Sequence, residues 1–216
     1  MSQSNPIPVV RSLLSPLYIS LYSIFSSDDL KNNCEQVLNQ AFGFIHYYHP
    51  SKLSRWLHFV SIIPFFSGIF LCLAFFISAT TGLEWSRTIV TVWAILYVIF
   101  AMGIDRNVAL VMAVNCLGVY LACSHTIEKY GSSADVSVLI HGLIYEAVAI
   151  ILQIIVGHLV VDKRTPAFFI QEGFVLAPIY ITLRCVFMDN IKSYKPWRSA
   201  ILHHVTADKY QKFSRL

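Results

Sequence analysis

The stretch Leu57–Leu83, LHFVSIIPFFSGIFLCLAFFISATTGL, decides the fold class of this protein. Its 27 residues contain no Asp, Glu, Lys or Arg. About 20 consecutive apolar residues are enough for a helix to cross the hydrocarbon core of a membrane. The stretch therefore predicts a transmembrane helix.

Three further runs are almost free of charge: Thr88–Ile104, Asn107–Ile127 and Val136–Val161, of which only the last is interrupted, by Glu146. Each is long enough to span a membrane, although Thr88–Ile104, with 17 residues, only just reaches the lower limit. A fifth run, Thr165–Leu183, contains two prolines and a glutamate. It predicts a re-entrant, interfacial or bundle-packed helix.

The composition supports this interpretation, because 56% of the residues are hydrophobic and only 13% are charged, against about 25% charged in a typical soluble domain. We expect an all-α fold, an integral membrane helical bundle with about four transmembrane helices plus interfacial or re-entrant helices. An interfacial segment is expected at 1–27, the membrane domain at 28–190 and a basic amphipathic tail at 191–216. No cleavable signal peptide is expected.

The basic residues predict the orientation. The loops on one side and the tail carry most of them, including Lys52, Arg55 and Arg106, whereas the opposite loops hold only Arg87 and Lys129. Cytosolic loops carry the excess of Lys and Arg, so both termini are expected in the cytosol. The net charge of +4 then reflects loops that face the lipid bilayer, and no nucleic-acid partner is expected.

Three histidines stand where spans begin or end. His49 and His58 lie nine residues apart on either side of Pro50, and His158 lies near the end of the fourth run. The expected topology places all three at one depth of the bundle, where helical proteins build metal sites. Asp162 follows His158 by four residues and so shares its helix face, where its carboxylate is expected either to bind the metal or to hold the imidazole N–H of His158. This set suits ferrous iron, Fe(2+), with open coordination positions, although hydrogen-bonded interfacial histidines would explain it too.

For the other polar residues near the spans, the sequence leaves two possible roles open. His46 is either a further ligand or an exposed side chain. His141, Glu146 and Gln153 either form a polar seam between helices or line a substrate cavity. Familiar catalytic motifs such as G-x-S-x-G, the P-loop and H-E-x-x-H are absent from the sequence.

Three motifs resemble those of the Mpo1-like family, once called a domain of unknown function. They are YYHPSKLSRWLH at 47–58, GHLVVDKRTPA at 157–167 and FVLAPIYITL at 174–183. In this sequence Asp162 stands where the family usually has glutamate, Ser54 where it has asparagine and Ile154 where it has glutamine. The proline of the second motif, Pro166, is expected to end the fourth helix.

The resemblance implies an iron(II)-dependent dioxygenase that uses O2 to shorten 2-hydroxy fatty acids by one carbon. Such α-oxidation serves phytosphingosine catabolism at the endoplasmic reticulum, and a bacterial member would lie in the inner membrane. The implied iron ligands are His49, His58 and His158, and the acyl tail would lie among aromatic residues such as Phe65, Phe66 and Trp93. The alternatives are a non-catalytic membrane protein with a structural polar seam and a small transporter.

Overall fold

The computed structural model of the protein describes residues 38–39, 41–82, 86–163 and 172–205. All regular secondary structure within these ranges is helical, which confirms the expected all-α fold. The predicted interfacial segment 1–27 and the end of the predicted tail, residues 206–216, lie outside the described residues.

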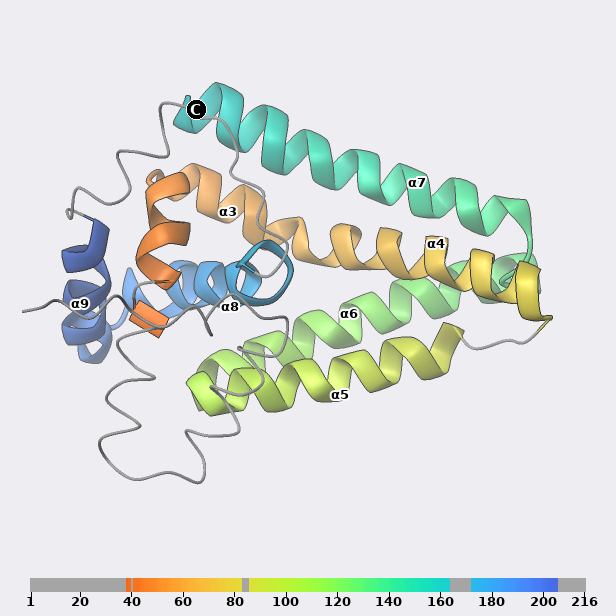
Figure 1. Ribbon diagram of the computed structural model, residues 1–216, viewed down its shortest axis with the longest axis horizontal. Coiled ribbons are helices and arrows are strands. Elements are labelled where there is room, and N and C mark those ends of the chain that lie inside the picture. Colours follow the sequence, from red (N-terminus) through yellow and green to blue (C-terminus); the bar gives the residue numbers. More distant parts are fainter. Residues whose placement is uncertain (1–37, 40, 83–85, 164–171, 206–216) are drawn as a thin grey trace, which may run out of the picture.

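Four helical stretches are long and apolar enough to cross a membrane, as the sequence predicts. The first joins α3 (Lys52–Val60) to α4 (Ile62–Thr81), and the last joins α7 (Val136–Ile150) to the wider-turned π-helix η2 (Ile151–Asp162). The other two are α5 (Ser86–Ile104) and α6 (Arg106–Tyr130). Figure 1 shows them running along the length of the molecule.

The closest packing between spans joins α4 to α7, which lie side by side in Figure 1. Glycine makes this approach possible, because a Cβ atom added to Gly68 would lie only 2.8 Å from the carbonyl oxygen of Gly142. In a membrane, small residues let helix backbones approach and gain van der Waals contact. α5 and α6 form the second closely packed pair.

The helix ends follow ordinary capping chemistry. Asp105 begins α6 by accepting hydrogen bonds from the backbone N–H groups of Asn107 and Val108, each at 2.9 Å. Gly131, with φ of 76°, ends the same helix, since glycine adopts this left-handed conformation without steric penalty. These caps fix where the long helices turn back.

From Glu172 on, the fifth apolar segment is a helix packed inside the bundle, one of the three possibilities that the sequence allows; its residues 165–171 lie outside the described residues. It comprises η3 (Glu172–Leu176), α8 (Ala177–Thr182) and η4 (Leu183–Met188). Tyr180 and Leu183 are fully buried, and α8 contacts both α3 and α6. The segment therefore fills the end of the bundle at which the first span begins.

The C-terminal part of the described chain also packs on this end, through η5 (Lys192–Tyr194) and α9 (Lys195–Val205). Trp197 donates a hydrogen bond from Nε1 to Oδ1 of Asn39 at 2.8 Å, and Ile201 is buried. Lys195 and Arg198 remain exposed. The apolar side of α9 thus covers protein, and its basic side faces outward.

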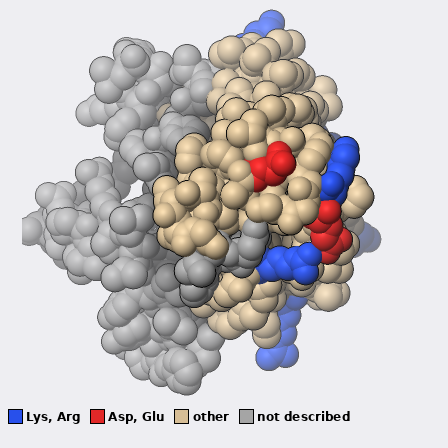
Figure 2. Space-filling view, turned by 90° about the vertical axis from the view of Figure 1, so that its right-hand side faces the viewer, with Lys and Arg blue, Asp and Glu red and all other residues tan. Residues whose placement is uncertain are grey.

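The opposite end of the bundle carries few charged side chains, as Figure 2 shows for the described residues. An ion pair between Arg87 and Glu128 lies here, with 2.6 Å between Nη2 and Oε1. Both side chains are exposed. The charges of this pair are therefore in contact with solvent.

Candidate metal centre

The local sequence brings His49 and His58 to one place. Residues 41–48 are helical, and the helix stops before Pro50, because a residue that precedes proline avoids the α conformation. Ser51 then caps α3 by accepting a hydrogen bond from the backbone N–H of Ser54 at 3.0 Å. The turn between the two helices sets the two imidazole rings face to edge.

His158, from η2, completes a group of three. The ring centroids lie 4.3 Å apart for His49 and His58, 4.7 Å for His49 and His158, and 5.0 Å for His58 and His158. All three side chains are buried, and one nitrogen from each lies within 4.8 Å of the others. The group can therefore hold a metal ion, as the sequence predicts for these residues.

The hydrogen bonds of His49 and His58 determine where their protons are. Nδ1 of His49 lies 2.7 Å from the carbonyl oxygen of Ile45, and Nδ1 of His58 lies 2.9 Å from that of Ser54. A carbonyl oxygen only accepts, so each Nδ1 carries a proton, and each neutral ring keeps a lone pair on Nε2. Those two Nε2 atoms are 3.2 Å apart, so two acceptors face each other.

His158 contributes a third acceptor. Its ring forms a hydrogen bond with the backbone of Tyr48, and its Nδ1 is buried with no hydrogen-bond partner in the described part of the chain. The bond to Tyr48 therefore uses Nε2–H, and Nδ1 keeps its lone pair. Three lone pairs without protons thus meet in one buried place, which is the arrangement that metal coordination requires.

The surroundings of His49 keep its ring neutral. Burial, and then the neighbouring His58 and His158 rings, lower the pKa of His49 well below its usual value. A neutral imidazole is the form that binds metal. The fixed Nδ1–H bonds to backbone carbonyls are also the kind of outer contact that orients histidine ligands in metal sites.

Asp162 lies beside the group but is not one of its three members. Its Oδ1 accepts a hydrogen bond from the backbone N–H of Ser51 at 3.2 Å, and its Oδ2 is buried without a partner among the described residues. Asp162 thus ties the end of η2 to the start of α3. The Nδ1 atom of His158 forms no hydrogen bond with it, so the expected contact from Asp162 to the imidazole Nδ1 is not formed.

The helix that carries His158 ends differently from the sequence expectation. η2 stops at Asp162, where Lys163 takes a left-handed conformation with φ of 51°. The stop therefore comes before Pro166, which lies outside the described residues. A positive φ is uncommon for a residue other than glycine, so Lys163 takes an unusual conformation directly after the helix that carries His158. The wide turns of η2 are a second unusual feature, and such π-type turns often occur at functional sites.

His46 does not join the three histidines. Its Nδ1 lies 2.7 Å from the hydroxyl oxygen of Tyr180. Burial, and then the positive charges of Arg184 and Arg55, lower the pKa of His46 to about 3. His46 is therefore a neutral, hydrogen-bonded side chain behind the group.

His141 and Glu146 lie on α7, away from the group. The ring of His141 has neighbours at both nitrogens, the carbonyl oxygen of Ser137 at 2.9 Å and the hydroxyl oxygen of Tyr130 at 3.4 Å. Glu146 packs where α7 meets Gly68 of α4. Neither residue lines the cavity beside His58, so these positions suit the polar seam between helices better than the lining of a substrate cavity.

Sequence reasoning missed a buried ionic cluster next to the turn that carries His49. Arg55, which the sequence analysis counts as a loop charge, is 4% exposed. Its Nη1 donates to the carbonyl oxygens of His49 at 3.0 Å and Pro50 at 2.6 Å, and its Nη2 lies 3.2 Å from Oδ2 of Asp189. Arg184 pairs with the other oxygen of Asp189 at 3.1 Å. The signal for this cluster was Arg184, because an arginine inside the apolar stretch Phe174–Met188 requires a partner.

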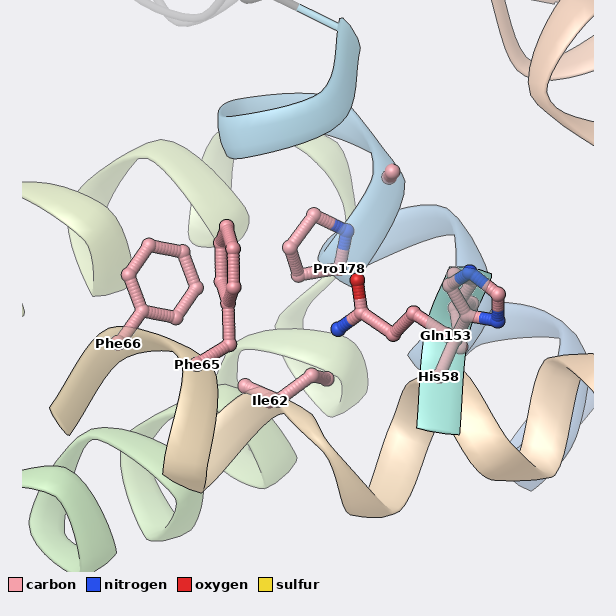
Figure 3. A pocket seen from close by; sticks show the side chains of 8 residues that line it. His58, Ile62, Phe65, Phe66, Gln153 and Pro178 are labelled. Carbon is pink, nitrogen blue, oxygen red and sulfur yellow. The ribbon is translucent and has the colours of Figure 1, made fainter. Parts of the chain in front are cut away.

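A small cavity of about 30 Å³ adjoins the group. Figure 3 shows His58 and Gln153 at it, with Ile62, Phe65, Phe66 and Pro178. Of the aromatic residues expected beside a substrate, Phe65 and Phe66 line this cavity, whereas Trp93 packs against Phe66 with 4.7 Å between ring centroids. The cavity therefore provides open space directly beside one of the three histidines.

Comparisons with known proteins add nothing to this geometry. No family model matches the chain, and no curated protein or solved structure matches it either. Any functional assignment therefore depends on the residues themselves.

Proposed function

We propose that His49, His58 and His158 bind ferrous iron and that the protein is an iron(II)-dependent dioxygenase that shortens 2-hydroxy fatty acids by one carbon. The observation that carries the proposal is the 3.2 Å approach of two unprotonated Nε2 atoms. Two lone pairs at this distance repel unless a cation lies between them. The resemblance of the motifs around the three histidines to the Mpo1-like family supports the choice of reaction.

The donor set fits iron. Imidazole nitrogen suits iron among the first-row metals, and a site with few protein ligands leaves positions for O2 and substrate. Bound ferrous iron supplies the electrons with which O2 is activated. The carboxylate of Asp162, tied to Ser51, adds a negative charge next to the site.

The chain itself holds the ligands and excludes water. Backbone carbonyls fix the rings of His49 and His58, and Arg55 clamps the carbonyl groups at the turn between them. Burial of all three rings keeps bulk water away. Preorganised groups in a closed site lower the barrier of a reaction more than the same groups do in water.

The location suits a lipid substrate. The three histidines belong to the end of the bundle where α3 begins and η2 ends, and exposed Lys52, Arg106 and Lys163 lie at helix ends on the same side. We infer that this end and both termini face the cytosol. Such a site receives a fatty acid from the bilayer, in the endoplasmic reticulum of a eukaryote or the inner membrane of a bacterium.

Metal analysis tests the proposal most directly. Purified protein is expected to bind one ferrous ion per chain and to consume O2 with 2-hydroxypalmitate, releasing a product one carbon shorter. His49→Ala, His58→Ala and His158→Ala are each expected to lose iron and activity. Wild-type protein that takes up no iron on reconstitution, or iron-loaded protein that leaves the acid intact, contradicts the proposal.

A structural role for the polar residues is the second candidate. Nε2 of Gln153 donates to Oγ of Ser61 at 2.7 Å, so η2 is hydrogen-bonded to the junction of α3 and α4. If helix association were the sole role, His158→Ala would lower the free energy of unfolding by the same amount in buffer that contains metal and in buffer that contains a chelator. The proposed metal centre predicts that chelation removes most of the difference.

A further inference from the structure

The cavity beside His58 has room for one small chemical group. Its volume of about 30 Å³ exceeds the roughly 10–15 Å³ that a cavity needs to hold one water molecule. Ile62, Phe65, Phe66 and Pro178 make apolar walls, and His58 and Gln153 are the polar residues among those that line it. A hydroxyl group therefore fits in this space.

The orientation of the Gln153 amide follows from its neighbours. Oγ of Ser61 donates its only proton to the carbonyl oxygen of His58, at 2.9 Å. The contact of 2.7 Å between Ser61 and Gln153 therefore needs a donor from the glutamine, which is its NH₂ group. The amide oxygen, Oε1, is left without a hydrogen bond in the described part of the chain.

Figure 3 shows where this oxygen lies. The Gln153 side chain extends among Ile62, Phe65 and Pro178, with Oε1 on the side of Pro178. The cavity thus presents one hydrogen-bond acceptor between apolar walls, next to a ring of the candidate metal centre. A donor such as a hydroxyl group is favoured there, whereas a carboxylate is repelled by the amide oxygen and loses its hydration.

We propose that Gln153 selects the hydroxyl group of the substrate, by accepting a hydrogen bond from the oxygen on C2 of the fatty acid through Oε1. The inference rests on the proposed function, because it takes its substrate class from there. It adds the residue that distinguishes a 2-hydroxy acid from an ordinary fatty acid. A site built to bind a hydroxyl group discriminates strongly against an analogue that lacks it.

The test compares two ligands on full-length, iron-loaded protein without oxygen, so that only binding is measured. Gln153→Leu keeps the size of the side chain but removes the acceptor. We expect it to weaken binding of 2-hydroxypalmitate by about tenfold, the size of one neutral hydrogen bond, and to leave binding of palmitate unchanged. The preference for the hydroxylated acid then falls by the same factor.

Two further variants provide a control and an independent check for this test. Asn115→Leu makes the same chemical change at a buried amide that bonds the carbonyl oxygen of Val111 on its own helix, and it should leave the preference intact. Ser61→Ala releases the Gln153 amide without removing it and should lower the preference by about threefold. Ser61→Ala also serves if Gln153→Leu does not fold.

The outcomes separate this inference from the proposed function. Wild-type protein that binds no iron overturns the proposed function and the inference with it. Iron-loaded wild type that prefers 2-hydroxypalmitate, together with folded Gln153→Leu and Ser61→Ala that keep the full preference, overturns the role of Gln153 alone. Equal weakening of both acids in these variants overturns it as well, because that result reports a general effect on the site.

Discussion

His58 and His141 have the same local hydrogen bond and opposite surroundings. In both, Nδ1 faces the carbonyl oxygen four residues earlier, that of Ser54 at 2.9 Å and that of Ser137 at 2.9 Å. Nε2 of His141 then meets the hydroxyl group of Tyr130, which can donate a proton. Nε2 of His58 instead meets another acceptor, Nε2 of His49.

The two ends of the bundle differ in their ion pairs as well. Arg55 and Asp189 pair with side chains only 5% and 12% exposed, whereas Arg87 and Glu128 pair with side chains 54% and 62% exposed. The charged pair at the opposite end is thus in contact with solvent, whereas the pair beside the histidines is not. The comparison teaches that a metal site is marked by acceptors left without donors, and not by the presence of histidine.

The largest expected difference between the ends concerns stability. Asp189→Ala leaves the buried guanidinium groups of Arg55 and Arg184 without their carboxylate and should lower the free energy of unfolding by about 3–5 kcal/mol. Glu128→Ala, at the exposed pair, should lower it by less than about 1 kcal/mol. Unfolding in detergent, followed by circular dichroism, measures both. Equal losses would show that the two ends do not differ in this way.

The next contrast concerns metal affinity. His58→Ala removes one of three ligands and should weaken metal binding by more than about 100-fold, since outer contacts alone are worth about 10- to 100-fold. His141→Ala should leave the affinity unchanged, because the ring of His141 belongs to the opposite end. Titration with Co²⁺, followed by visible absorption, measures the two variants side by side. A similar loss in both would refute the difference between the histidines.

Removal of metal should act on one end only. At a free metal concentration 100 times the dissociation constant, binding stabilises the folded state by about 2.7 kcal/mol. A chelator should therefore lower the melting temperature of wild type and of His141→Ala but not that of His58→Ala. Thermal unfolding with and without the chelator gives the result. A chelator effect of wild-type size in His58→Ala would place the metal elsewhere.

The smallest effect is expected for a polar pair at the opposite end. The hydroxyl oxygens of Ser78 and Ser133 lie 2.6 Å apart, and both side chains are buried. Ser78→Ala should lower the free energy of unfolding by about 1 kcal/mol and leave metal affinity unchanged. The same unfolding and titration assays apply. A changed metal affinity would mean that the two ends are coupled.

Local sequence patterns predicted most of the helical spans and the positions of the three histidines at their ends. The charge-free runs predicted the four spans, and Pro50 predicted the break between the helices that carry His49 and His58. The grouping of His158 with these two followed from the expected topology. The end of η2 at Lys163 was missed, because a left-handed lysine leaves no sequence signal comparable to that of glycine or proline.

The sequence by itself determined that the chain consists of apolar helices and that three histidines lie at helix ends on one side. Hydropathy and proline act locally, so a single chain displays them. Only the tertiary structure decided that Arg55 is buried against Asp189, that Asp162 bonds Ser51 and that Gln153 turns its oxygen into a cavity. Those contacts join residues 92 to 134 positions apart, and they depend on how the helices pack.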